Sequence, residues 1–378
     1  MQRYGPHVLH RPRHPRPIVR SRTRIAWTAC LLAAVLLAAC GGDDRSERPT
    51  TTTAAERDST TSTDVGPDAT AAGGPPAGAP VPSAGCEAAT PPPPVTEEHR
   101  TVEVAGAERW FLLTTPEPTG APLALVLDFH GLSEGAEIHT RMSSFDEVAQ
   151  REGFVVAYPN GTGEPVRWQI GVEDASDLDF TDTMIDTLGR DLCLDLSRVY
   201  ATGLSNGAMF SSVLACRRQD RIAAIAPVSG LLYPEDCQTE RPVPVLTFHG
   251  TADPILYFNG GVGELSGLMQ GATDASSVSV PAVDLEGEGY PENVRKWAAH
   301  NDCDAKPADT RPVPDVLLRT YECPEDGPVD FYVVEGGGHS WPGSAFSEAI
   351  VNIVGPTNME LQASELIWDF LSRYRLPA

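Results

Sequence analysis

The sequence lacks the residue patterns that usually bind metal ions or nucleic acids. It contains no C-x-x-C pair, and beyond residue 40 no two histidines stand at the spacing of a zinc-ligand pair. Basic residues are scarce, since 28 Lys and Arg stand against 52 Asp and Glu, for a net charge of −24. Such acidity argues against binding to nucleic acid, and against binding of the folded domain itself to anionic lipid. We expect no metal, no cofactor and no nucleic-acid partner.

No apolar run is long enough for a comfortable membrane span. The apolar run 25–39 follows seven arginines without an acidic residue, and it ends in Leu-Ala-Ala just before Cys40. A basic segment, a short apolar segment and small residues describe a secretory signal. A cysteine at this point looks like the lipobox of a bacterial lipoprotein. We expect residues 1–39 to be the signal peptide and Cys40 to carry the lipid anchor; an ordinary signal peptide with an incidental cysteine is the alternative.

Large apolar residues are almost missing between residues 40 and 95. This stretch is rich in Thr, Ser, Ala, Gly and Pro, including the runs 50–53 and 91–94. It cannot bury enough apolar surface to offset its ordering entropy, so we predict a flexible tether. Six cysteines remain when Cys30 and Cys40 are set aside, and five of them follow this stretch. The even total of six in an exported chain suggests disulfides. Cys303 with Cys323 is our first choice of pair.

Residues 96–378 are long enough for one large α/β domain. Near-continuous apolar runs such as 123–129 are typical of strands covered on both faces. We expect strands at 100–104, 109–114, 123–129, 154–158, 198–202, 222–228, 243–248 and 331–334, and helices at 141–151, 177–191, 208–214, 292–299 and 361–374. Alternation of strands and helices predicts a mostly parallel central sheet with helices on both faces. Ligands bind such sheets beyond the carboxyl ends of the strands.

The segment 203–207 has the pattern G-x-S-x-G, between a predicted strand and a predicted helix. In this context the pattern indicates a nucleophile elbow, in which a tight turn exposes Ser205 at the end of the strand. The glycines are explained because a Cβ at Gly203 or Gly207 would strike neighbouring atoms. An ordinary turn with a capping serine is the alternative.

Asp253 and His339 also stand just after predicted strands. A serine hydroxyl needs a base to take its proton, and the base needs a carboxylate to orient it and stabilise its cation. We assign Ser205 as nucleophile, His339 as general base and then acid, and Asp253 as orienting carboxylate. The order Ser…Asp…His is the order of α/β-hydrolases.

Other residues compete for these roles. His249 also follows a strand but is expected to pack or hydrogen-bond locally, and His300 lies on a predicted helix. Asp177 and Asp179 precede the serine, against the expected order, and Asp253 itself could cap its own turn.

The tetrahedral intermediate of acyl transfer needs backbone N–H donors for its oxyanion. One donor should be Asn206, the residue after the nucleophile. The second should come from the loop after strand 123–129, where His130-Gly131-Leu132 stands, and we choose Leu132. A plain turn at the strand end is the alternative interpretation of His130-Gly131.

Four motifs in this order resemble the polyhydroxybutyrate depolymerase/feruloyl esterase family of secreted esterases: Asp-Phe-His-Gly at 128–131, Val-Tyr-Ala-Thr-Gly-Leu-Ser-Asn-Gly at 199–207, Phe-His-Gly-Thr-Ala-Asp at 248–253 and Gly-His-Ser-Trp-Pro-Gly at 338–343. The resemblance covers roughly residue 86 to the C-terminus. It implies an α/β-hydrolase fold and hydrolysis of carboxylic esters by the three residues named above. The chain departs from the family at Ala208, where a second glycine is common, and at Leu132, where cysteine is frequent.

Two tryptophans stand near the expected site. Trp341 follows the general base, and Trp168 lies in the loop after the strand 154–158. They could form an aromatic wall for a phenolic acyl group, with His130 also contacting substrate; packing roles are the alternative.

These observations predict an exported serine esterase, anchored by lipid to the outer face of a bacterial membrane or secreted. The family's substrates include feruloyl and acetyl esters of polysaccharides and hydroxyalkanoate oligomers, among which the sequence does not choose. A serine peptidase on the same fold, or a cell-surface binding protein with an inactive triad, is the alternative.

Overall fold

The computed structural model describes residues 78–171, 175–237, 239–263, 271, 273–324 and 326–377. The expected signal peptide, Cys40 and most of the expected tether lie outside these residues. Within the described ranges, no helix has both the length and the apolar character needed to cross a membrane.

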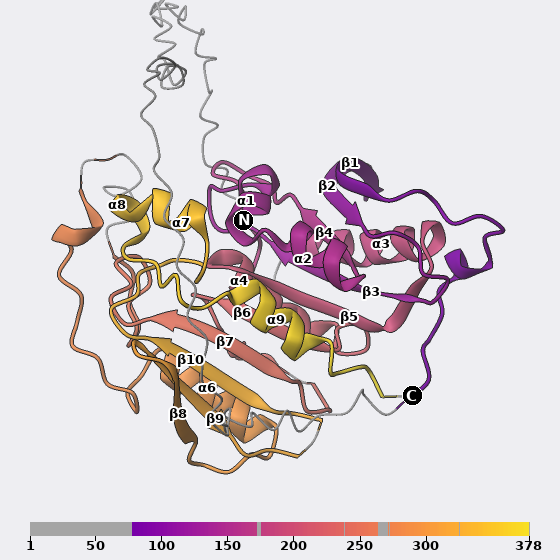
Figure 1. The fold of residues 1–378 in the computed structure, drawn as a ribbon. Coiled ribbons are helices and arrows are strands. Elements are labelled where there is room, and N and C mark those ends of the chain that lie inside the picture. Colours follow the sequence, from indigo (N-terminus) through magenta and orange to yellow (C-terminus); the bar gives the residue numbers. More distant parts are fainter. Residues whose placement is uncertain are drawn as a thin grey trace, which may run out of the picture. The chain divides into compact units, whose positions relative to one another are not determined.

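A ten-stranded sheet forms the centre of the described part of the chain (Figure 1). Its order is β1-β2-β4-β3-β5-β6-β7-β10-β9-β8. Strands β4, β3, β5, β6, β7 and β10 are parallel, whereas β1, β2, β9 and β8 add antiparallel edges. The bounds are β1 (Val95–Val104), β2 (Ala107–Thr115), β3 (Leu123–Phe129), β4 (Val155–Pro159), β5 (Leu194–Leu204), β6 (Ala224–Val228), β7 (Val245–Gly250), β8 (Ala308–Val313), β9 (Val316–Tyr321) and β10 (Val329–Val334).

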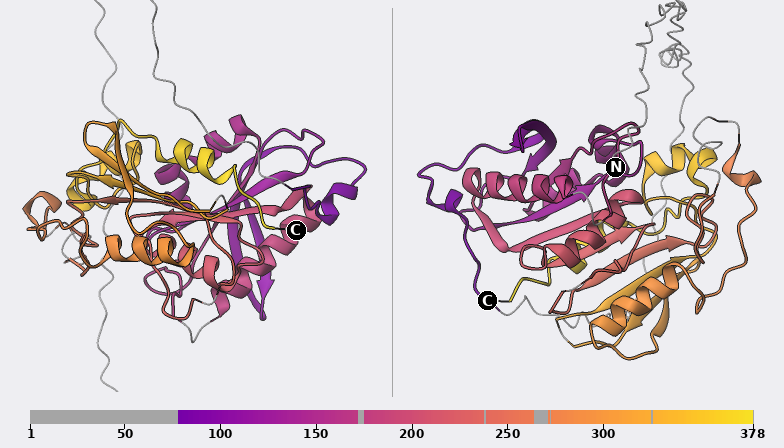
Figure 2. Two further views of the ribbon diagram at one scale, coloured as in Figure 1. Left: turned by 90° about the horizontal axis from the view of Figure 1, so that it is seen from below. Right: turned by 180° about the vertical axis from the view of Figure 1, so that it is seen from behind.

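Helices cover both faces of the sheet, as the left view in Figure 2 shows. Along β3, Leu125, Leu127 and Phe129 belong to one apolar cluster, whereas Ala124 and Val126 belong to another. The first cluster includes side chains of α3 (Ser176–Asp191), α4 (Asn206–Arg217) and α6 (Tyr290–His300). The second includes side chains of α1 (Ala136–Ser143), α2 (Phe145–Glu152) and α9 (Ala363–Leu371). This is the α/β-hydrolase fold with its central sheet covered on both sides, which confirms the predicted fold class.

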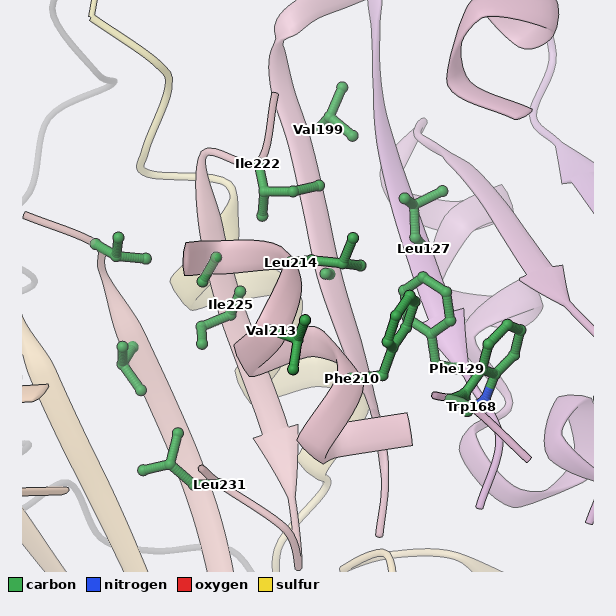
Figure 3. Close-up of a cluster of buried hydrophobic side chains, with 14 of the residues drawn as sticks. Leu127, Phe129, Trp168, Val199, Phe210, Val213, Leu214, Ile222, Ile225 and Leu231 are labelled. Atoms are coloured by element: carbon green, nitrogen blue, oxygen red, sulfur yellow. The ribbon is translucent and has the colours of Figure 1, made fainter. Parts of the chain in front are cut away.

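The start of α4 is packed against β3 by aromatic rings (Figure 3). Phe210 on α4 stacks on Trp168 with ring centroids 5.3 Å apart, and the edge of Phe129 meets both rings. All three rings are buried. Because aromatic pairs add to the free energy of apolar burial, this cluster fixes the turn between β5 and α4 against β3.

The structure corrects several sequence-based boundaries. The helix expected at 141–151 is two helices, α1 and α2, because Ser144 between them has a left-handed backbone (φ 49°). The short helices α7 (Ala345–Ala349) and α8 (Val351–Val354) and the pairing of β8 with β9 were not predicted. The last helix ends at Leu371, although Tyr374 was assigned to it.

The domain also begins earlier than the expected boundary at residue 96. A short 3-10 helix, η1 (Ala84–Glu87), lies against the start of β5, and Ser83 exchanges hydrogen bonds with Leu192 and Leu194. A disulfide joins Cys86 to Cys193. The composition of this stretch predicted a tether. The hydrogen bonds and the disulfide that attach it to the domain cannot be detected from composition.

Three disulfides are present in the described residues. The predicted pair Cys303–Cys323 is confirmed. The other two are Cys86–Cys193 and Cys216–Cys237. Disulfides of this kind persist in oxidising compartments.

Candidate active site

Ser205 lies at the turn between β5 and α4, in a strained backbone conformation. Its φ of 57° and ψ of −117° are rare for a residue with a side chain. A Cβ on Gly203 would lie 2.3 Å from the Phe129 carbonyl oxygen, and one on Gly207 would lie 2.0 Å from the same oxygen. Only glycine therefore fits at either position, and the G-x-S-x-G segment is a nucleophile elbow.

Asp253 and His339 come together across 86 residues of sequence. His339 Nδ1–H donates to Asp253 Oδ2 at 2.8 Å, and both side chains are buried. Asp253 follows β7 and His339 follows β10, two neighbouring parallel strands. Their carboxyl ends therefore lie at the same edge of the sheet as the end of β5.

The carboxylate of Asp253 is fixed by more than His339. Its Oδ1 accepts the backbone N–H groups of Ile255 and Leu256, both at 2.8 Å. Burial alone would raise the pKa of Asp253, but the imidazoles of His339 and His249 hold that pKa below its ordinary value. Asp253 is thus an anion that can orient His339 and stabilise its cation.

His249 contacts Asp253 and does not line the cavity with Ser205. Its Nε2–H donates to the Leu256 carbonyl oxygen at 2.9 Å and lies 3.3 Å from Asp253 Oδ2. The ring stacks on Tyr290 at 3.7 Å between centroids. As expected from the sequence, His249 makes local contacts.

The loop after β3 supplies backbone donors near Ser205. A Cβ built on Gly131 would lie 3.5 Å from Ser205 Cβ, so this loop passes directly beside the nucleophile. The N–H groups of Gly131, Ser133 and Glu134 are engaged, by Glu134 Oε2 and by the carbonyls of Val166 and Gly131 respectively. The loop's remaining N–H here is that of Leu132, which lines the same pocket as Ser205. Asn206 N–H, at the first position of α4, is a natural second donor because helix N-termini leave such groups free.

His130 does not reach the pocket, contrary to the expected contact with substrate. Its side chain is buried, Nδ1–H donates to the Gly131 carbonyl oxygen at 2.7 Å, and Nε2 accepts from Gly161 N–H at 2.9 Å. A donor on Nδ1 and an acceptor on Nε2 define one neutral tautomer. Burial lowers the pKa of His130 to about 4, which keeps the ring neutral.

The hydrogen bond from His130 Nδ1–H to the Gly131 carbonyl oxygen orients the Leu132 N–H. The Gly131 carbonyl and the Leu132 N–H belong to one planar trans peptide, so they point in opposite directions. A hydrogen bond that holds the carbonyl toward His130 therefore turns the N–H away from it. His130 is a positioning residue for this peptide group.

The expected aromatic wall is not formed by the two tryptophans. Trp168 and Trp341 are each about 1% exposed, and neither lines the pocket. Trp168 donates its Nε1–H to the His130 carbonyl oxygen, and its backbone exchanges two hydrogen bonds with the side-chain amide of Asn206. Trp341 donates to Ser364 Oγ and packs on Phe145. Both rings therefore pack in the apolar core, Trp168 on one face of the sheet and Trp341 on the other.

Ser205 and His339 open into one cavity of about 450 Å³. Its walls are mainly aliphatic, and Phe346 is the aromatic ring among them. The lining residues are Gly131, Leu132, Ser133, Glu134, Ile138, Met142, Leu204, Ser205, Asn206, Met209, Ile255, Leu256, Val262, His339, Phe346, Ile350, Ile353 and Val354. No lysine or arginine is among them.

The rival residues lie elsewhere. Asp177 is buried in an ion pair with Arg109 at 2.9 Å, and Asp179 is exposed on α3. His300 Nε2 lies 3.1 Å from the Arg241 carbonyl oxygen. None of them lines the cavity with Ser205.

A charged cluster that the sequence did not suggest lies behind the Leu132 loop. His139 on α1 is fully buried between Asp128 at the end of β3 and Glu134. No local pattern of residues indicates this cluster, since Asp128 and His139 are 11 residues apart and meet only after α1 folds onto β3.

In the described ranges, no group of three or more His, Cys, Asp or Glu is arranged to hold a metal ion. Fold and site together have the arrangement of a serine hydrolase. A strained serine, a histidine with a buried aspartate and a loop of backbone donors meet at one edge of an α/β-hydrolase sheet.

Comparisons of the sequence with known protein families and relatives show that this is an esterase. The family model for esterase PHB depolymerase matches residues 111–266. The Nocardia uniformis subsp. tsuyamanensis protein NocK, named as an esterase, is 32% identical over 299 residues, covering 73% of this chain and 83% of that protein. Feruloyl esterase B of Piromyces equi is 30% identical over 263 residues, covering 67% of this chain but 42% of that protein. Acetyl xylan esterase from Aspergillus awamori is a similar solved structure, with a TM-score of 0.49, 15% identity, and coverage of 67% of this chain and 98% of that one.

The chain belongs to the esterase PHB depolymerase family. It is a carboxylic ester hydrolase.

The role of His130 can be tested by a matched pair of substitutions. Asn places an amide N–H near the position of Nδ1 and keeps the bond to Gly131, whereas Gln places a carbonyl near Nε2 and keeps only the bond to Gly161. We expect kcat on p-nitrophenyl butyrate to fall about 100-fold in His130→Gln and less than tenfold in His130→Asn, with KM little changed. Equal kcat values in the two folded variants would contradict the positioning role.

Proposed function

We propose that the protein is an exported serine esterase in which Ser205, His339 and Asp253 form the catalytic triad. The observation that carries the proposal is the meeting of a strained Ser205 and an Asp253-bound His339 in one cavity. Because His339 Nδ1 is engaged by Asp253, Nε2 is the nitrogen available for proton transfer.

The reaction takes two steps in this arrangement. Ser205 Oγ attacks the ester carbonyl carbon while His339 takes the hydroxyl proton, and the carbonyl oxygen becomes an oxyanion near the N–H groups of Leu132 and Asn206. The intermediate collapses, and His339 gives its proton to the leaving alcohol. Water, activated by His339, then attacks the acyl-enzyme and releases the acid.

The cavity favours an uncharged aliphatic acyl group. Its walls offer Ile, Leu, Val and Met side chains from four segments, and the described lining residues include no lysine or arginine to pair with an acidic substrate. Each buried methylene is worth about 0.8 kcal/mol, roughly a factor of four in binding. Esters of short aliphatic acids and hydroxyalkanoate oligomers therefore fit the walls best. The likeness to feruloyl esterase B makes phenolic acyl esters the second candidate.

The proposed location is outside the cytoplasm. The three disulfides fit an oxidising compartment. The basic and apolar N-terminal stretch before Cys40 supports export and a lipid anchor at that residue.

Changing the residue at either end of the proposed triad should remove most or all of the turnover. We expect kcat on p-nitrophenyl butyrate to fall to background in Ser205→Ala, and by about 10³–10⁴ in Asp253→Asn, since the amide no longer stabilises the His339 cation. Asp179→Asn makes the same change on an exposed carboxylate and should leave kcat unchanged. Full activity in Ser205→Ala would refute the proposal.

Acyl preference can be measured on a graded set of esters. We expect kcat/KM to rise about 15-fold from p-nitrophenyl acetate to butyrate, because two more methylenes are buried, and to be lower on methyl ferulate and acetylated xylan. Ile353→Asn should flatten this rise, whereas Val351→Asn, exposed on the same helix and outside the lining, should not. A higher kcat/KM on methyl ferulate than on methyl butyrate would assign the phenolic class instead.

A further inference from the structure

Three ionisable side chains form a buried row behind the oxyanion loop. His139 Nε2–H donates to Asp128 Oδ1 at 2.8 Å, and His139 Nδ1–H donates to Glu134 Oε1 at 3.1 Å. The side chains of Asp128 and His139 are fully buried, and that of Glu134 is 9% exposed. Glu134 also lines the cavity that contains Ser205 and His339. The row makes no hydrogen bond to Asp253 or His339, and the chemistry described above does not use it.

The row carries a fixed cation. Both ring nitrogens of His139 face carboxylate oxygens, which accept hydrogen bonds when ionised, so both nitrogens carry protons. Burial by itself would lower the pKa of His139, but Asp128 and Glu134 raise it to about 10. In the same way, burial would raise the pKa of Glu134, and the His139 cation holds it below its ordinary value.

Glu134 connects this row to the loop beside Ser205. Its Oε2 accepts the Gly131 N–H at 2.6 Å, a short charge-assisted bond. Glu134 N–H returns to the Gly131 carbonyl oxygen at 3.2 Å, which closes the turn. The peptide before Gly131 is thus held by Glu134, and the peptide after it by His130.

Holding both peptides fixes the two backbone dihedrals of Gly131. Glycine is the residue with the most backbone freedom, so a loop built on it needs external restraints to keep one conformation. A donor that must meet a developing oxyanion gains most from being fixed before the reaction. The restraint must also be permanent, and a buried ionised carboxylate is stable only when it is paired.

We propose that Glu134, held by His139 and Asp128, is a positioning residue that keeps the Leu132 N–H aimed at the oxyanion. The proposal rests on the proposed function of Ser205.

The experiment compares Glu134→Ala and Glu134→Gln with Glu137→Ala, an exposed carboxylate at the start of α1. We expect kcat on p-nitrophenyl butyrate to fall 30- to 300-fold in Glu134→Ala with KM within about threefold. Gln keeps an oxygen for the Gly131 N–H, so kcat in Glu134→Gln should be at least about fivefold higher than in Glu134→Ala. Glu137→Ala should match wild type.

Binding of a transition-state analogue separates positioning from general damage. A butyl boronic acid places an oxygen in the oxyanion site, so its Ki should rise in Glu134→Ala by about the factor that kcat falls, at an unchanged circular dichroism spectrum. Where Glu134→Ala does not fold, the same comparison is made between Glu134→Gln and wild type, with a 3- to 50-fold fall in kcat and a parallel rise in Ki expected.

Two results overturn the proposal: wild-type kcat in folded Glu134→Ala, or a fall in kcat with an unchanged Ki. In the Gln comparison, unchanged kcat overturns it as well. Failure of the proposed role of Ser205 can be distinguished from failure of the proposed role of Glu134. In the first case Ser205→Ala would retain activity, whatever the activity of the Glu134 variants.

Discussion

The Phe129 carbonyl oxygen sits against the nucleophile turn, and the site depends on this close approach. A Cβ on either Gly203 or Gly207 would collide with this oxygen, so β3 and the start of α4 are as close as their backbones allow. The approach holds Ser205 in its strained conformation and brings the next residues of β3's loop, Gly131 and Leu132, beside it. The proposed nucleophile and the proposed oxyanion donor are therefore placed by one backbone contact, which the stacked rings of Trp168 and Phe210 stabilise.

Two buried histidine–carboxylate groups flank this contact and act in opposite ways. His339 is bound by a carboxylate at one nitrogen only, which leaves the other for proton transfer. His139 is bound at both nitrogens, so its proton stays and its charge serves as a fixed restraint. The difference comes from a single additional carboxylate, Glu134, and it separates a group that exchanges protons from one that holds a loop.

The sequence was sufficient to predict the α/β-hydrolase fold, the elbow and the Cys303–Cys323 pair, because each has a local signature in residue type and spacing. It was not sufficient for the roles of Trp168 and Trp341, since nothing in a sequence says which face of a strand-end loop a ring will occupy. The row Asp128–His139–Glu134 was invisible for a related reason. Its members are ordinary residues until α1 folds onto β3, and the pairing that keeps them charged exists only in the packed structure.

The central claim is that Ser205 is the single activated nucleophile of this esterase. Intact-mass spectrometry after treatment with a fluorophosphonate, followed by peptide mapping, tests it directly. The account predicts one adduct per chain on the peptide that contains Ser205, none in Ser205→Ala, and slower labelling in Asp253→Asn. An unlabelled wild-type protein, or equal labelling of Ser205→Ala, would contradict it.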